Sequence, residues 1–97
     1  MIFVWSEGIA VTSERISGEM QLFLNAFGES VRAYRQERGW SQEELAGRAG
    51  IDRTYVGCIE RGECNIGIAK VALLAETLGV QGSDLVRRAE ALMLDPE

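Results

Sequence analysis

The chain has 97 residues, of which 46% are hydrophobic and 26% charged, with a formal net charge of −5. This length supports about one domain, and the composition is that of a folded protein. With two cysteines and no histidine, a disulfide framework, a zinc site built with histidine and the commonest general base are excluded. We therefore expect no enzyme, no metal and no cofactor.

No apolar run approaches the length of a membrane span. Residues 1–5, MIFVW, are too short for the core of a signal peptide and follow no basic region. We expect a cytoplasmic protein without a membrane partner.

Residues 1–19 differ from the rest of the chain. Residues 1–5 look like a strand, and the turn-prone segment that follows has no helical pattern. Two interpretations stay open for this extension: an appended arm or start-site artefact, with Met20 as an alternative start, or an element that packs on a partner subunit. We expect the main domain to span residues 20–97.

A first helix is predicted over residues 22–38, because apolar residues recur there every three or four positions: Leu24, Phe27, Val31 and Tyr34. Gly39 ends this helix, and Trp40 is expected to fill the core between helices. Arg35 and Arg38, with Arg48 further along the chain, are interpreted as parts of a solvated face.

Two short helices follow with only Gly50 and Ile51 between them. The helix over residues 41–49 opens with Ser41 as N-cap and Glu44 three residues later, a capping box. Asp52 is a good N-cap for the helix over residues 52–60. We expect Leu45, Ala46 and Ala49 of the first helix, and Val56 and Ile59 of the second, to face inward.

The remaining residues predict two more helices. One spans residues 68–78 and ends at Gly79, with one apolar face: Ile68, Val71, Leu74, Ala75 and Leu78. The other spans residues 83–94, and its apolar set is large for a terminal helix: Leu85, Val86, Ala89, Leu92 and Met93. The predicted fold is therefore all-α, with five helices joined by short turns.

The two-residue turn between the second and third helices forces a steep crossing, the geometry of a helix-turn-helix. In that motif the second helix lies in the DNA major groove with its N-terminal end towards the bases, and the first spans the phosphate backbone. Arg53 can bond to guanine, Thr54 can meet thymine or a base edge, and Tyr55 can reach a phosphate. Gln42 suits a phosphate contact at a helix N-terminus. Gly57, Arg61 and Asn65 complete the predicted DNA-binding surface.

A net charge of −5 by itself argues against DNA binding, but the distribution of the charges weakens this argument. Between residues 29 and 66 there are six basic and seven acidic residues, whereas the rest of the chain has four basic and eight acidic. The acidity is concentrated in the flanks, so a locally positive face in the middle is compatible with the composition.

Residues 27–65, with the sequences RGWSQEELA, RAGIDRTYV and IERG, together with the helix after them, resemble the Xre-type helix-turn-helix family with the lambda-repressor-like fold. Within that family they look most like the controller proteins of restriction–modification systems. The resemblance covers residues 27–85 and implies a five-helix, dimeric transcriptional regulator that binds double-stranded DNA at a palindromic operator.

Three positions depart from the family pattern. Gly57 and Cys58 stand in the recognition helix, and Cys64 stands where controllers commonly carry an arginine. Gly57 costs the helix about 0.5–1 kcal/mol relative to alanine, and Cys64 removes a phosphate contact. Cys58 is interpreted as a small buried hydrophobe in preference to part of a redox switch.

The relatives imply a dimer through the last helix, and its seam is predicted at Leu85, Leu92 and Met93, although these side chains can also belong to the monomer core. The leading function is a homodimeric sequence-specific regulator, with a restriction–modification controller as its narrower form. The alternatives are an antitoxin and a protein–protein adaptor on a helix-turn-helix scaffold.

Overall fold

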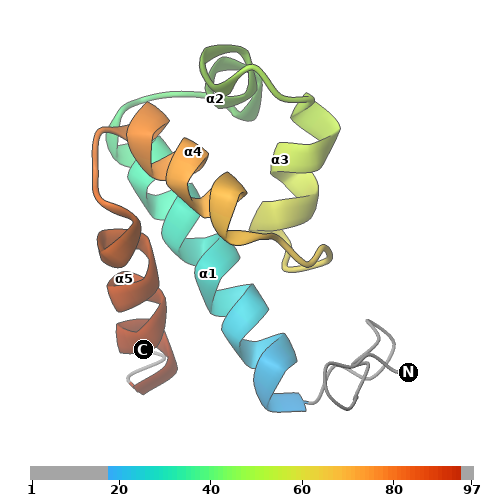
Figure 1. Ribbon diagram of the computed structural model, residues 1–97, viewed down its shortest axis with the longest axis vertical. Helices are drawn as coiled ribbons and strands as arrows, with labels where there is room; N and C mark the ends of the chain where they lie inside the picture. The colour runs from blue at the N-terminus through green and yellow to red at the C-terminus, as the bar shows by residue number, and fades with distance from the viewer. Residues whose placement is uncertain (1–17, 95–97) are drawn as a thin grey trace.

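The computed structural model describes residues 18–94, which form five helices and no strand (Figure 1). Their bounds are Gly18–Glu37 (α1), Gln42–Ala49 (α2), Arg53–Glu60 (α3), Ile68–Leu78 (α4) and Gly82–Leu94 (α5). The predicted all-α, five-helix fold is confirmed. The strand predicted in residues 1–5 lies outside the described residues. The domain boundary at residue 20 stays a prediction, although α1 already begins at Gly18.

The helix ends follow the predicted caps. Ser41 accepts a hydrogen bond from the backbone N–H of Glu44 at 3.0 Å, and Asp52 accepts one from that of Thr54 at 2.9 Å. The capping box is only half made, because the Glu44 carboxylate accepts from Arg48 Nε at 2.7 Å. Backbone polar groups at both helix starts are thereby satisfied locally, as the sequence indicated.

One apolar core joins all five helices, with α1 packed against α5 and α3. Its fully buried side chains include Val31, Leu45, Val56, Leu74 and Leu85. Trp40 is half-buried against this core, as predicted. Within residues 18–94, every helix falls short of the length and hydrophobicity that a bilayer span requires.

The contact between α1 and α3 depends on Gly28. A Cβ atom at this position would lie 2.5 Å from the carbonyl oxygen of Glu60, closer than real Cβ contacts. The absence of a side chain therefore lets the C-terminal end of α3 approach α1 directly.

Ile68 belongs to the predicted apolar face of α4, but its side chain is 83% exposed. The helical period places it in line with Val71 and Ala75, but it lies in the first turn of α4, at the edge of the surface that α5 covers. The hydrophobic core does not extend to this turn, so the Ile68 side chain is exposed to solvent.

Candidate nucleic-acid interface

The helices α2 and α3 form a helix-turn-helix. Gly50 adopts φ +73°, a conformation that favours glycine, and the backbone N–H of Ile51 donates to Ala46 O at 3.0 Å. In Figure 1, α2 is seen nearly end-on, whereas α3 runs downwards in the plane of the view, so the two axes cross steeply. This arrangement confirms the geometry expected from the two-residue turn.

The two sides of α3 differ in burial. Val56 and Ile59 face the core and are almost completely buried, while Arg53 and Thr54 are exposed on the first turn. Among the described residues, Arg53 is the only arginine without an ion pair. Its guanidinium is therefore available to an external acceptor, at the end of α3 that a helix-turn-helix directs to base edges.

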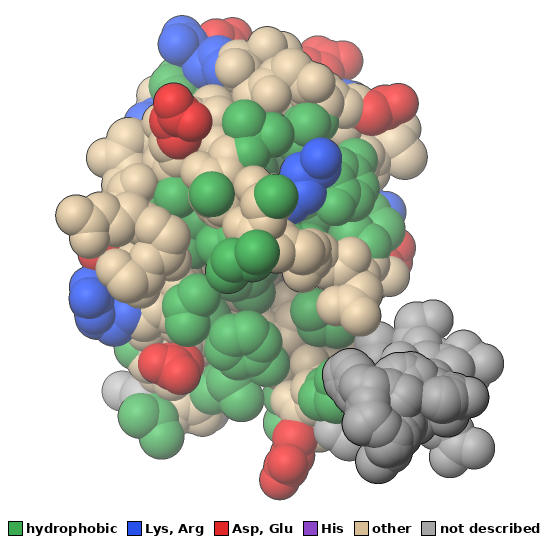
Figure 2. All heavy atoms as spheres, in the orientation of Figure 1, with side chains coloured by type: hydrophobic (Ala, Val, Ile, Leu, Met, Phe, Trp, Pro, Cys, Tyr) green, Lys and Arg blue, Asp and Glu red, His purple; other side chains and the backbone are tan. Residues whose placement is uncertain are grey.

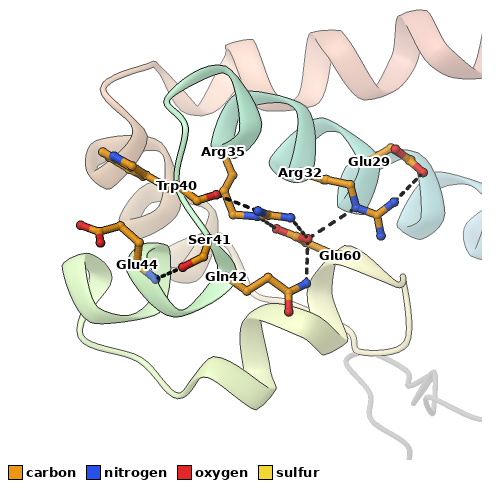
Figure 3. A network of polar contacts seen from close by, with 8 residues as sticks. All are labelled: Glu29, Arg32, Arg35, Trp40, Ser41, Gln42, Glu44 and Glu60. Atoms are coloured by element: carbon orange, nitrogen blue, oxygen red, sulfur yellow. Dashed lines mark hydrogen bonds and ion pairs between the residues drawn. The ribbon is translucent and has the colours of Figure 1, made fainter.

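The other end of α3 is anchored by a buried carboxylate (Figure 3). Glu60 accepts from Arg35 Nε at 2.7 Å, from Arg35 Nη2 at 3.0 Å and from Gln42 Nε2 at 2.9 Å. Arg32 Nε lies 3.5 Å away, and Arg35 also donates to Trp40 O at 2.8 Å. One carboxylate thus ties α3 to both α1 and the first residue of α2.

Burial alone would raise the pKa of Glu60. The hydrogen bonds from Arg35 and Gln42, with the charges of Arg35 and Arg32, outweigh burial and hold this pKa below its ordinary value. Glu60 is therefore ionised at neutral pH although its side chain has no exposed surface.

The sequence interpretation missed this anchor. Arg35 was assigned to a solvated face, but it is 9% exposed and paired with Glu60. A signal was present: Glu60 follows Val56 by four residues and Ile59 by one, so it belongs to the buried stripe of its helix. A carboxylate on such a stripe needs a buried cation.

The other two arginines assigned to that face stay partly or largely accessible. Arg38 is half-buried and donates to Leu78 O at 2.6 Å, closing the C-terminal end of α4. Arg48 is exposed, with its guanidinium carbon 4.3 Å from the centroid of the Trp40 ring.

Gln42 begins α2, where a phosphate contact is predicted. Its amide nitrogen is held by Glu60, and the side chain is part-buried. The amide is therefore fixed in orientation, with its oxygen near the surface of α3 at Gly57.

Tyr55 lies in the first turn of α3, and Asn65 lies in the loop that follows this helix. Tyr55 is half-buried, with Lys70 Nζ 5.9 Å from its ring centroid. Burial first, and then the neighbouring thiols of Cys64 and Cys58, raise the pKa of its phenol, so Tyr55 is a neutral hydrogen-bond donor at physiological pH. Asn65 is exposed. Their predicted DNA contacts stay predictions.

Gly57 is predicted to belong to the exposed DNA-binding surface, but it is buried because two side chains cover it. A Cβ atom placed on Gly57 would lie 3.0 Å from Arg61 Nη1 and 3.6 Å from Gln42 Oε1. Arg61 itself is the exposed C-cap of α3, and its Nε lies 3.1 Å from Glu63 Oε1. A direct DNA contact by Gly57 therefore requires Arg61 to move aside.

Cys58 and Cys64 are both free and half-buried. Burial, followed by the hydrogen bond and charge of the Cys58 thiol, raises the pKa of Cys64 to about 12. A thiol with such a pKa is a poor nucleophile at neutral pH. The description of Cys58 as a small hydrophobe holds in part, since its side chain is half-buried and not fully enclosed.

The predicted dimer seam needs a correction at Leu85, whose side chain is fully buried. The Leu85 carbonyl accepts from the buried Ser30 hydroxyl at 2.9 Å. This residue belongs to the monomer core and offers nothing to a partner. Leu92 is half-buried against the core, and Met93 is 41% exposed.

A shallow apolar groove lies between α4 and α5, with a volume of about 560 Å³. It is lined mainly by Ile68, Val71, Ala72, Val80 and Val86. Figure 2 shows hydrophobic side chains gathered on this face of the molecule, over α4 and the region below it.

Comparison with known proteins agrees with this geometry. The model of the helix-turn-helix family matches residues 31–85, more than half of the chain. A hypothetical transcription factor of Neisseria meningitidis is 44% identical over 57 residues, which are 59% of this chain and 54% of the relative. The chain thus matches about half the length of that relative.

Two solved structures are also similar. The restriction–modification controller C.AhdI of Aeromonas hydrophila is 40% identical, covering 64% of this chain and 94% of the controller, with a TM-score of 0.63. The controller C.Esp1396I, solved as a tetramer with its natural 35-base-pair operator, is 29% identical, covering 75% of this chain and 94% of that one, with a TM-score of 0.69. The present chain belongs to the helix-turn-helix family, and the predicted resemblance to restriction–modification controllers is confirmed.

Proposed function

We propose that this helix-turn-helix protein is a sequence-specific transcriptional regulator that binds double-stranded DNA as a homodimer, with a restriction–modification controller as its narrower form. The proposal assigns the chain no catalytic role and no cofactor. It also places the protein in the cytoplasm, where DNA lies in bacteria such as those of the similar proteins.

The observation that carries the proposal is the unpaired Arg53 on the exposed first turn of α3. Every other arginine among residues 18–94 has an acidic partner. A guanidinium in that position can bond bidentately to guanine in the major groove. The solved complex of C.Esp1396I with its operator supports the same use of the fold in a relative.

The experiment compares Arg53→Ala with the wild type in gel shifts on the DNA upstream of its own gene and on random DNA. Arg53→Ala should lose about 1–3 kcal/mol on the specific operator and much less on random DNA. Arg87→Ala is the matched control, because Arg87 is an exposed arginine on α5, away from α3. Equal losses on both DNAs would limit Arg53 to phosphate contact, and no binding by the wild type at low salt would refute the function.

We propose that the dimer seam is the groove between α4 and α5. Met93, which the sequence predicts in the seam, lies on α5 beyond the end of this groove. The support is the exposed isoleucine Ile68, since contiguous apolar surface of this kind commonly marks an interaction site. A two-fold dimer then requires an operator with two half-sites about 10 bp apart, or a multiple of that.

Sedimentation of two charge variants distinguishes this seam from one centred on Leu92. Ile68→Glu puts a carboxylate into the α4–α5 groove and should produce monomers. Leu22→Glu is the control, because Leu22 is 59% exposed and lines a different hollow, together with Leu92 and Met93. Monomers from Leu22→Glu and dimers from Ile68→Glu would move the seam back to Leu92.

A further inference from the structure

We propose that Gly57 and Arg61 act as one unit of the DNA-reading surface: the missing side chain at 57 gives the guanidinium of Arg61 a place on the middle of α3, from which it contacts DNA. The inference rests on the proposed function and deepens it. The group it would bind is a hydrogen-bond acceptor of DNA, either a phosphate oxygen or the O6 and N7 edge of guanine.

The first support is the path of the Arg61 side chain. Side chains on a helix lean towards its N-terminus, so residue 61 covers residue 57, one turn earlier. Arg61 Nη1 comes within 3.0 Å of the point where a Cβ of residue 57 would stand. The guanidinium therefore rests directly on the helix backbone, about one turn of 5.4 Å closer to the N-terminal end of α3 than the Arg61 backbone.

The second support is the state of the guanidinium. Its Nε faces Glu63 Oε1 at 3.1 Å, and neither Nη group has a hydrogen-bond partner among residues 18–94. The side chain is 52% exposed. Glu63 thus orients Arg61 from one edge and leaves its two terminal nitrogens available to an acceptor.

The third support is the position between two helices of the motif. Gln42 Oε1 lies 3.6 Å from the Cβ point of Gly57, and the Gln42 amide is held by buried Glu60. The guanidinium thus lies beside the N-terminus of α2, where the backbone of DNA is expected, and in line with Thr54 on α3. An ordinary side chain at 57 would displace it from this position.

The test is a double-mutant cycle of Gly57→Val and Arg61→Ala, measured by fluorescence anisotropy on the operator and on random DNA. Each single variant should lose about tenfold in operator affinity, the loss of one charge-assisted hydrogen bond. The double variant should bind no worse than Arg61→Ala, because valine can displace nothing once the guanidinium is gone. Additive losses would overturn the inference, since valine would then be obstructing DNA by itself.

Thermal unfolding separates this effect from misfolding. Gly57→Val should melt no lower than the wild type, because glycine is a poorer helix former than valine. If it melts lower, Gly57→Ala replaces it in the cycle with the same non-additivity and a smaller loss expected, since a Cβ alone requires Nη1 to shift only slightly.

The same titrations show whether the acceptor is a phosphate oxygen or a guanine edge. Arg61→Ala should flatten the salt dependence by about one unit, with similar losses on both DNAs, if the partner is a phosphate. A loss confined to the operator identifies a guanine edge. If the wild type binds operator DNA and Arg61→Ala loses nothing, only this inference fails; if the wild type binds no DNA, the proposed function fails with it.

Discussion

Replacing Glu60 by alanine removes the acceptor at the centre of the buried network and leaves Arg35 without a counter-charge. Arg35 is 9% exposed and places two nitrogens on Glu60, at 2.7 and 3.0 Å. Breaking a buried ion pair from one side costs about 3–5 kcal/mol, and the lost bond from Gln42 adds about 0.5–1.5 kcal/mol. Against a total stability of about 5–15 kcal/mol for a small domain, Glu60→Ala should lose a large share of the free energy of unfolding.

Urea unfolding at pH 7, followed by far-ultraviolet circular dichroism, measures this loss. Glu90→Ala is the matched control, because Glu90 is an exposed helical glutamate without an ion pair among the described residues. Its effect should stay within about 0.5 kcal/mol. The double variant Arg35→Met, Glu60→Leu should be more stable than Glu60→Ala, because it leaves no buried charge unpaired. A midpoint for Glu60→Ala equal to that of Glu90→Ala would refute the role assigned to the network.

Three further predictions concern titration and charge. The pKa of Glu60 is lowered on folding, so its stabilisation is present above the ordinary glutamate pKa of about 4.3 and is lost as pH falls through the lower folded value. Between about pH 5 and pH 2, the free energy of unfolding measured in urea should therefore fall more steeply for the wild type than for Glu60→Gln. An equal fall in the two proteins would contradict this. With a pKa of about 12, Cys64 should react with iodoacetamide far more slowly in the folded protein than in urea, as measured by mass spectrometry; equal rates would show an accessible thiolate. Cys64→Arg should tighten DNA binding and steepen its salt dependence by about one unit, whereas no change in either would place residue 64 away from DNA.

The helices and their ends could be read from the sequence because the signals that determine them are local. Ser41 and Asp52 cap their helices through atoms within three residues, and Gly50 and Gly79 end helices at positive φ. The turn between α2 and α3 depends on the same short-range chemistry. The sequence therefore sufficed for the fold, the helix-turn-helix and the exposed position of Arg53.

Only the tertiary structure showed which side chains meet between helices. The pair of Arg35 and Glu60 spans 25 residues, and helical periodicity does not report which partner a buried charge finds. Ile68 is exposed and Leu85 is fully buried because burial depends on where a neighbouring helix ends. Arg61 lies over Gly57 because the missing side chain leaves space there, which residue spacing alone does not show. Local signals determine elements, whereas the surfaces these elements offer to DNA and to a partner are decided by packing.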